Sequence, residues 1–429
     1  MSSIKLGWNF ILSLPELNQH LPKPDLLNNG QVSSYIRSKL RPLIFKTINI
    51  SEAIDLIPED ITYEGTFDEK YEALNSEFSH VQKLVKRTEL DLNTDPILTP
   101  VIVNYFENIN SLTISEAIFP HPTFKMIFNT LKKLKILKIN YTLILFHPLA
   151  NEEEDIYLPE SLTTLFLTQM AGVKTSQFEN IQTFMNNESD DESDATAVNL
   201  RLSTNFPNLK KLRFLRGNEQ VIMTLEQFIL PNSQLEIVEI FIDQINPQLF
   251  NLLETHCKNL KSVRIYPSSE GPLLSNEIYN YPALPSVETL NLFKLYYYES
   301  DILLNLVASF PNISHLIISN TYALNSPIFD YIQNLEKLTK LTIYLGESES
   351  KPDIINLKSN KLTRIEFKNF ENFNFFTFDI LDNLPKVNNI KIETKGFESS
   401  ELDTFYHYVK YVAGWRAIKF EDSAGLYKL

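Results

Sequence analysis

The sequence predicts an α/β repeat fold, an elongated solenoid in which short parallel strands alternate with helices. Phrases such as FPNLKKLRFL (206–215), LPSVETLNLF (284–293) and FPNISHLIIS (310–319) share apolar residues at relative positions 0, +3 and +5. The pattern returns with a mean period of about 26 residues over about three hundred residues. Positions +3 and +5 point to one face of a strand, because side chains alternate along it. The period therefore predicts one strand per unit, each buried on the same side.

Twelve units fit this pattern. They are Ile109/Leu112/Ile114, Leu134/Leu137/Ile139, Leu162/Leu165/Leu167, Leu209/Leu212/Phe214, Leu235/Val238/Ile240, Leu260/Val263/Ile265, Val287/Leu290/Leu292, Ile313/Leu316/Ile318, Leu338/Leu341/Ile343, Leu362/Ile365/Phe367, Val387/Ile390/Ile392 and Trp415/Ile418/Phe420. One longer interval holds the acidic insertion MNNESDDESDATAV (185–198), which we expect to form a solvated loop.

Helix-like stretches separate the strands. Residues 247–257, 301–310 and 402–412 carry apolar side chains at helical spacing. The position three before the first apolar residue of a unit is apolar in eight units, namely Phe106, Leu131, Phe206, Cys257, Leu284, Phe310, Leu335 and Leu384. In four units proline follows it, which predicts that a helix ends there and an extended segment begins.

The pattern L-x-x-L-x-L at this period resembles the leucine-rich repeat family. Cys257 stands where Phe310 stands in its own unit, which is similar to the cysteine-containing subtype, whose members often carry an N-terminal F-box. The resemblance implies a horseshoe of about twelve repeats with a parallel sheet on its concave side. Position +8 carries Ala117, Thr142 and Met170 instead of the family's asparagine, so we expect irregular loops.

Residues 21–50, LPKPDLLNNGQVSSYIRSKLRPLIFKTINI, resemble the second half of an F-box, with a helical SYIRSKL and the exit RPLIFKTINI. In that family the exit leads directly into the repeats, and Phe45/Ile48/Ile50 fits the strand pattern. The resemblance implies adaptor binding by Leu14, Pro15, Leu21, Pro22, Leu26, Leu27, Val32 and Ile36. The alternative is that residues 1–50 only cap the open end of the solenoid.

The two resemblances imply three parts of the chain. We expect an F-box-like helical segment over residues 1–50 and a connector with an N-terminal cap or irregular repeat over residues 51–108. We expect a leucine-rich repeat solenoid over residues 109–429, with the acidic loop insertion at 185–198.

Composition and motifs argue against catalysis. The net charge of −14 disfavours bulk binding to nucleic acid or to anionic membranes. The ten glycines form neither G-x-G-x-x-G nor G-x-x-x-x-G-K, and H-E-x-x-H and G-x-S-x-G do not occur. We therefore predict no enzyme, no cofactor, no metal and no membrane span. A single cysteine rules out an intramolecular disulfide and predicts a cytoplasmic or nuclear protein.

If +3 and +5 point inward, +2, +4 and +6 face the concave side. The candidate partner-binding residues there are Phe166, Lys211, Arg213, Phe241, Arg264, Tyr266, Phe293, His315, Lys340, Tyr344, Arg364, Lys368 and Lys391. Nine Lys or Arg against four acids in these slots predict an acidic or phosphorylated protein target. A nucleic-acid partner is a weaker alternative, and another is that these cations serve solubility alone.

The two resemblances together imply a non-catalytic substrate-recognition subunit of an SCF-type cullin–RING ubiquitin ligase. The F-box-like segment would bind a Skp-type adaptor and the concave face would bind the target. The alternative is an interaction scaffold outside any ligase, in which the N-terminus only caps the solenoid.

Overall fold

The computed structural model describes the chain in segments. The described residues are 18, 21–32, 34–49, 66–91, 98–147, 149, 155–175, 196–198, 201–215, 224–267, 280–292, 295, 300–319, 331–345, 357–370, 378–394, 407, 414–419 and 423–429. They fall into two compact units. Unit 1 comprises Met1–Leu209 and Arg216–Thr224, and unit 2 comprises Lys210–Leu215 and Leu225–Leu429.

Both units contain strands and helices, and β5 to β9 follow one another without a helix between them in the described residues. The elements of unit 1 are α3 (Lys23–Val32), α4 (Ser34–Ile44), β1 (Thr47–Asn49), α7 (Phe67–Phe78), the 3₁₀ turn η1 (Gln82–Leu84), β2 (Arg87–Leu90), α8 (Thr99–Tyr105), β3 (Ser111–Ser115), β4 (Ile118–Pro120), α9 (His121–Thr130), β5 (Ile136–Phe146), β6 (Asp155–Ile156), β7 (Thr164–Lys174), β8 (Thr196–Val198) and β9 (Arg201–Leu202).

Unit 2 is also built from strands and helices. Its elements are β10 (Lys211–Leu215), α11 (Leu225–Ile229), β11 (Ile237–Phe241), η3 (Ile242–Gln244), α12 (Pro247–His256), β12 (Ser262–Tyr266), β13 (Thr289–Leu292), α13 (Ser300–Ala308), β14 (His315–Ser319), β15 (Lys340–Tyr344), β16 (Arg364–Phe370), η7 (Phe378–Asn383), β17 (Asn389–Thr394), β18 (Trp415–Lys419) and β19 (Ser423–Lys428).

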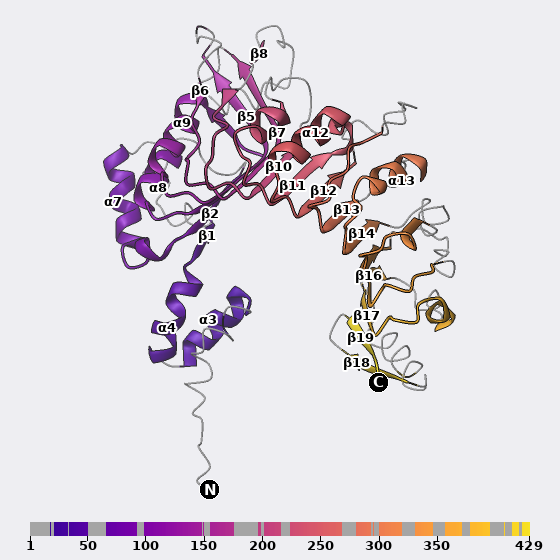
Figure 1. Ribbon diagram of the computed structural model, residues 1–429. Coiled ribbons are helices and arrows are strands. Elements are labelled where there is room, and N and C mark those ends of the chain that lie inside the picture. The colour runs from indigo at the N-terminus through magenta and orange to yellow at the C-terminus, as the bar shows by residue number, and fades with distance from the viewer. Residues whose placement is uncertain are drawn as a thin grey trace, which may run out of the picture. The chain divides into compact units, whose positions relative to one another are not determined.

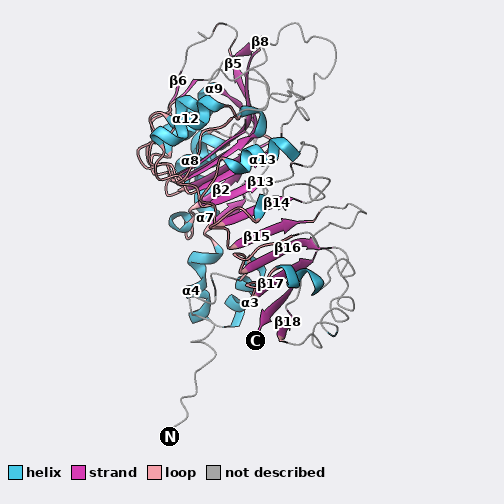
Figure 2. Cartoon of the chain, turned by 45° about the vertical axis from the view of Figure 1, so that its right-hand side comes forward, coloured by secondary structure: helices cyan, strands magenta, loops and turns pink. Residues whose placement is uncertain are grey.

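The repeat strands pair in parallel and in one register. In unit 1, β1, β2, β3, β5 and β7 pair in that order, and in unit 2 β10 to β17 do the same. Each +3 residue lies opposite the +3 residue of the next strand, as in Val238, Val263 and Leu290. These parallel strands, with helices between them, confirm the predicted α/β repeat class (Figures 1 and 2).

Burial follows the same register. The residues at 0, +3 and +5 are buried in the eleven units from Ile109 to Ile392. Burial alternates along the strands, so that in β12 and β14 the second and fourth residues are buried and their neighbours are half-buried. The helices supply the other half of the core, with Phe124 on α9 and Phe250 on α12 fully buried. The predicted helices at 247–257 and 301–310 are α12 and α13, while 402–412 lies almost entirely outside the described residues.

A tight turn leads into most of the repeat strands. In FPNL (206–209) the N–H of Leu209 donates to the carbonyl of Phe206 at 3.0 Å, and the N–H of Ile313 donates to Phe310 in the same way at 3.4 Å. Proline favours the second position of such a turn because its ring fixes φ. The eight apolar residues at the first position, Cys257 among them, are all buried. Of the four helix ends predicted from proline, α13 ends before Phe310 and the 3₁₀ segment η7 ends before Leu384, whereas β9 and coil precede Phe206 and coil precedes Leu284. FPN therefore marks the turn into the strand and does not always mark the end of a helix.

A left-handed residue recurs at position +7 of several units. Glu116, Tyr141, Gln169 and Asn369 have φ between 48° and 55°. In β5 and β7 the paired register passes from Asn140 and Thr168 directly to Thr142 and Met170, so Tyr141 and Gln169 form matching kinks. The kink lets β5 and β7 reach 11 residues each, longer than the short strands expected.

The twelfth predicted unit does not extend the parallel stack. β18 contains Trp415 and Ile418, but it pairs antiparallel with β19, which in turn pairs antiparallel with β17. The C-terminal strand β19 therefore occupies the edge of β17, where Ala424 and Leu426 are buried. Ile418 is exposed, and Phe420 lies outside the described residues.

The end of the acidic insertion is a strand rather than a loop. Thr196–Val198 form β8 and pair antiparallel with Gly172–Lys174 at the end of β7. Just beyond it, β9 pairs in parallel with β6. Residues 185–195 lie outside the described residues.

The N-terminal helices form a small cluster that leads into the first strand. Leu26 on α3 and Ile36, Leu40 and Ile44 on α4 are buried together. β1 follows directly and pairs with β2, where Val85, Thr88 and Leu90 match the 0, +3 and +5 pattern. Arg41 donates to the carbonyl of His80 at 2.7 Å and ties α4 to the segment that precedes β2. The connector 51–108 thus contains a repeat strand.

Replacement of Leu290 by alanine tests the shared register. Leu290 is fully buried at position +3 of β13, so Leu290→Ala should lower the free energy of unfolding by about 2–5 kcal/mol. Leu230→Ala is the matched control, because Leu230 is half exposed at the end of α11. Urea titrations should show a large shift for the first variant and little for the second, and equal shifts would contradict the assignment.

Candidate functional site

The side chains at +2, +4 and +6 of strands β10 to β17 form one surface, here called the open face. They alternate with the buried residues +3 and +5, so they point away from the core of unit 2. Most are only half-buried, and they include every charged residue of these eight strands. The open face is therefore where unit 2 presents ordered charged groups.

A buried carboxylate organises the first three strands of the open face. Glu239 on β11 is only 1% exposed and accepts Lys211 Nζ and Arg213 Nε, each at 2.7 Å. The register places Arg213, Glu239 and Arg264 side by side, and Arg264 Nη1 lies 3.8 Å from the carboxylate. We call Lys211, Arg213, Glu239, Arg264 and Tyr266 the Glu239 cluster.

Tyr266 closes this cluster from the third strand. Its hydroxyl donates to Glu239 Oε2 at 3.0 Å and accepts from Arg264 Nη1 at 3.2 Å. Both guanidinium groups lie over its ring, at 5.4 Å for Arg213 and 5.9 Å for Arg264. Burial alone would raise the pKa of Glu239, but the hydrogen bonds and charges of Lys211 and Arg213 outweigh it and lower that pKa. The carboxylate therefore stays ionised although it is buried.

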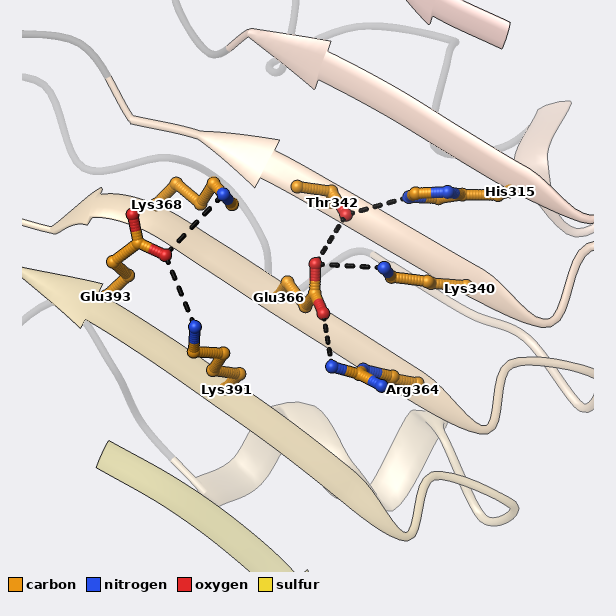
Figure 3. Close-up of polar contacts among 8 residues, drawn as sticks. All are labelled: His315, Lys340, Thr342, Arg364, Glu366, Lys368, Lys391 and Glu393. Atoms are coloured by element: carbon orange, nitrogen blue, oxygen red, sulfur yellow. Dashed lines mark hydrogen bonds and ion pairs between the residues drawn. The ribbon is translucent and has the colours of Figure 1, made fainter. Parts of the chain in front are cut away.

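A second carboxylate organises strands β14 to β16. Glu366 accepts from Lys340 Nζ at 3.1 Å, from Thr342 Oγ1 at 3.2 Å and from Arg364 Nη2 at 2.5 Å (Figure 3). Burial would raise the pKa of Glu366, and Lys340 and Arg364 reverse that effect and lower it. We call His315, Lys340, Thr342, Arg364 and Glu366 the Glu366 cluster.

The tautomer of His315 follows from this hydrogen-bond chain. His315 Nε2 lies 2.9 Å from Thr342 Oγ1, whose single proton goes to the Glu366 carboxylate (Figure 3). Thr342 can then only accept, so His315 donates through Nε2–H. Burial, with the nearby charge of Lys340, lowers the pKa of His315 to about 4. His315 is therefore neutral at pH 7.

A third acid completes the open face. Glu393 on β17 lies 3.5 Å from Lys368 Nζ and 3.4 Å from Lys391 Nζ (Figure 3). Lys368 Nζ also lies 5.5 Å from the centre of the Tyr344 ring. These three charged residues add two positive charges and one negative charge to the end of the sheet.

β13 lies between the Glu239 cluster and the Glu366 cluster, and neither β13 nor β14, whose His315 is neutral, has an ionised group on the open face. β13 places Thr289 and Asn291 on the open face, and β14 places His315, Ile317 and Ser319 there. Asn291 is 4% exposed, and its Oδ1 has no hydrogen-bond partner among the residues that the structure describes. A buried carbonyl oxygen without a donor is costly to the fold, and this one is too fully covered to be reached from the open face.

The predicted open-face residues divide into three groups. The first group surrounds the two buried carboxylates and consists of Lys211, Arg213, Arg264, Tyr266, Lys340 and Arg364. The second group lies at the end of the sheet, where Glu393 pairs with Lys368 and Lys391 and Lys368 lies over the Tyr344 ring. His315, bonded to Thr342, and the phenylalanines make up the rest. Phe241 is nearly buried, and Phe293 lies outside the described residues. In unit 1, Phe166 is also nearly buried, with Lys138 Nζ 5.6 Å from its ring centre.

The role of the acids was not predicted from the sequence. Glu239, Glu366 and Glu393 are among the four acids that were set against the nine cations, whereas in the structure each one is a hub that orders the cations. The signal was present, because a single register puts Glu239 between Arg213 and Arg264 at position +4. Opposite charges on adjacent strands at the same position stabilise the pairing.

The predicted adaptor-binding residues are only partly at the surface. Leu26 and Ile36 are buried in the cluster that joins α3 to α4, and Leu21 packs partly against it. They hold the two helices together instead of facing a partner. Leu27 is 45% exposed, and Pro22 is exposed beside it. Leu14, Pro15 and the side chain of Val32 lie outside the description.

Comparison with known proteins adds little to this geometry. No protein-family model and no curated protein matches the chain. A structural match is the crystal structure of an internalin (inlF) from Listeria monocytogenes, 13% identical, covering 84% of this chain and 97% of that one with a TM-score of 0.29. At that TM-score the likeness supports no assignment, so the class of fold, an α/β repeat, rests on the strand register above.

Other kinds of site find no support in the described segments. There, no group of three or more His, Cys, Asp or Glu side chains is placed to hold a metal ion. Within the same segments no helix has the length and apolar character needed to cross a bilayer. Cys257 is buried, which raises the pKa of its thiol to about 11. A thiol of that kind is a packing group rather than a nucleophile.

Replacement of Glu239 by glutamine tests the first hub. Glu239→Gln leaves three cations without their shared anion and should lower the free energy of unfolding at pH 7 by about 1–3 kcal/mol. The folded pKa of Glu239 is lowered, so its contribution is present above the unfolded pKa and disappears as pH falls through the folded value. The gap between variant and parent in urea titrations should therefore close in acid. Glu254→Gln, which removes an exposed pair with Lys258, should cost no more than about 0.5 kcal/mol. A loss of stability in Glu239→Gln as small as that in Glu254→Gln would contradict the role of Glu239 as a hub.

Lowering the pH should show how much the neutral state of His315 contributes to the stability of the fold. Its folded pKa of about 4 lies below the ordinary 6.5, so between these values the unfolded chain binds the proton and the folded chain does not. Stability should therefore fall as pH falls through this window, by about 1–2 kcal/mol after screening by solvent. His315→Gln should flatten that part of the curve, and His256→Gln, on the exposed side of α12, should not. Equal curves for both variants would exclude this role of His315.

Proposed function

We propose that the chain is a non-catalytic protein-interaction receptor that serves as the substrate-recognition subunit of an SCF-type cullin–RING ubiquitin ligase. The α3–α4 helix pair would bind a Skp-type adaptor. The open face of unit 2 would bind an acidic or phosphorylated protein target. Such a receptor would act in the cytoplasm or the nucleus, and it would need neither cofactor nor metal.

The observation that carries this proposal is the direct passage from the helix pair into the repeats. Residues 21–50 resemble the second half of an F-box, and α4 is followed at once by β1, which pairs with β2. Leu27 and Tyr35 are 45% and 54% exposed on the two helices, although both are large and apolar or aromatic. An adaptor that covered both side chains would remove their apolar surface from water.

The target-binding half of the proposal is supported by charge. The side chains on the open face are held by hydrogen bonds and ion pairs to Glu239, Glu366 and Glu393, so their positions are fixed before a ligand arrives. Fixed side chains lose little conformational freedom on binding. Each group of cations also exceeds its acids in number, which suits an anionic ligand.

A second candidate function is an interaction scaffold in which α3 and α4 only cap the first repeats. The observation that favours it is the contact of α4 with the first repeat. Arg41 donates to the carbonyl of His80, and the rings of Phe45 and His80 meet edge to face with centroids 6.2 Å apart. A cap would contribute to stability and would bind no adaptor.

Co-purification with a Skp-type adaptor separates the two functions. The full chain should retain the adaptor, and the double variant Leu27→Glu/Tyr35→Glu should lose at least tenfold in affinity, because both changes put charge on the exposed apolar surface. Phe67→Glu is the control, since Phe67 is similarly exposed at the start of α7.

Removal of residues 1–44 is the complementary change, because it deletes the helices and keeps β1 paired with β2. The ligase proposal expects adaptor binding to be lost while unfolding changes little. No adaptor binding by the full chain, combined with a clear loss of stability on deletion, would overturn the proposal in favour of the cap.

A further inference from the structure

We infer that the open face of unit 2 binds one extended, carboxylate-rich polypeptide segment that carries two acidic patches separated by an uncharged spacer. The spacer would be about four to seven residues long, from the strand spacing and the length per extended residue. The inference deepens the target-binding half of the proposed function. It does not depend on the adaptor, so the two can fail separately.

The positive charge of the open face falls into two equal groups. On β10 to β12, Lys211, Arg213 and Arg264 stand against Glu239, which leaves an excess of two positive charges. On β15 to β17, the cations Lys340, Arg364, Lys368 and Lys391 stand against Glu366 and Glu393, which again leaves an excess of two. The whole chain carries a net charge of −14, so these two groups are local positive sites on an acidic protein.

The distance between the groups follows from the order of the strands. β12 and β15 are three steps apart and β11 and β16 are five steps apart. With about 4.8 Å per step, the groups lie about 14 Å apart at their near edges and about 24 Å apart at their centres. An extended chain covers about 3.3 Å per residue, which gives the spacer its length.

The strands between the groups suit an uncharged, extended spacer. β13 and β14 present Thr289, Asn291 and Ile317 and no ionised group on the open face. Ile317 on β14 is half-buried and offers apolar contact to a side chain of the spacer. A charged spacer would find no counter-ion here.

The arrangement favours carboxylates spread over several residues above a single compact phosphate. Glu239 and Glu366 already occupy the points where the cations converge, so a phosphate cannot take those points. The cations themselves are spread along the sheet, over β10 and β12 in the first group and over β15 to β17 in the second. Several carboxylates along a peptide match such a distribution, whereas one phosphate concentrates its charge and its acceptors in one place.

Fluorescence anisotropy with synthetic peptides tests this inference on the full chain. One peptide has two aspartates, five serine or glycine residues and two more aspartates, and a second has the same composition with its four aspartates contiguous. We expect the spaced peptide to bind at least tenfold more tightly, and its affinity to fall as salt rises. A third peptide carries one phosphoserine in place of each aspartate pair.

Three variants assign the binding to the two groups. Arg264→Gln and Lys340→Gln should each weaken binding of the spaced peptide about five- to tenfold, and the double variant should remove the preference for spacing. Lys258→Gln should change nothing, because Lys258 lies beyond the end of α12, pairs with Glu254 there and is not on the open face. Thermal unfolding of each variant verifies that the fold is retained.

Several outcomes would overturn the inference. The first is equal affinity for the spaced and the contiguous peptides. The second is a loss of peptide affinity in Lys258→Gln as large as that in Arg264→Gln or Lys340→Gln. The third is binding of the phosphorylated peptide alone. Preferential binding of single-stranded nucleic acid over all three peptides would also overturn it. Adaptor binding without peptide binding would leave the ligase proposal standing and remove this one, and the reverse result would do the opposite.

Discussion

The structure depends on one constraint, which is that every repeat strand pairs in the same register. Position +3 faces position +3 of the next strand from β10 to β17, and the same holds for β3, β5 and β7. A shift of one residue would turn the apolar side of a strand toward solvent and the charged side toward the helices. The turn before most of the strands keeps the register, because the N–H of the first apolar position donates to the carbonyl three residues earlier. Before β16 the N–H of Leu362 donates instead to the side-chain hydroxyl of Ser359.

The same register decides the chemistry of the open face. It aligns residues of equal position into columns, so that charges separated by about 26 residues in sequence become neighbours. Glu239 can be buried because this alignment puts Arg213 and Arg264 on either side of it. Glu366 lies opposite Thr342 and is neutralised by Lys340 on β15 and by Arg364 on its own strand. At position +4 of β13 and β14 the residues are Asn291 and Ile317, which carry no charge, so the open face is neutral there. The two positive groups and the interval between them are thus consequences of strand order.

Much of the fold could be predicted from the sequence, because the apolar pattern at 0, +3 and +5 reports burial directly. The pattern failed at Trp415, since it cannot show that β19 returns antiparallel and takes the place beside β17. It also could not show the left-handed kinks at Tyr141 and Gln169, which lengthen β5 and β7. The open face was predicted in position and in sign. The hubs of the open face were not predicted, because the pairing of Glu239 depends on neighbours in other repeats. The burial of Leu26 and Ile36 was not predicted either, because it depends on how α3 packs against α4.

Disulfide trapping between adjacent strands tests the common register most directly. Ser262 and Thr289 lie opposite each other at position +2 of β12 and β13, about 4.8 Å apart at Cα. A pair offset by two residues, Ser262 and Asn291, lies about 8 Å apart, beyond the range of an unstrained disulfide. Native Cys257 is buried, and the raised pKa of its thiol keeps it from competing. Under mild oxidation Ser262→Cys/Thr289→Cys should form a cross-link rapidly and Ser262→Cys/Asn291→Cys slowly or not at all, whereas equal or reversed rates would contradict the register on which the repeat fold and the open face both depend.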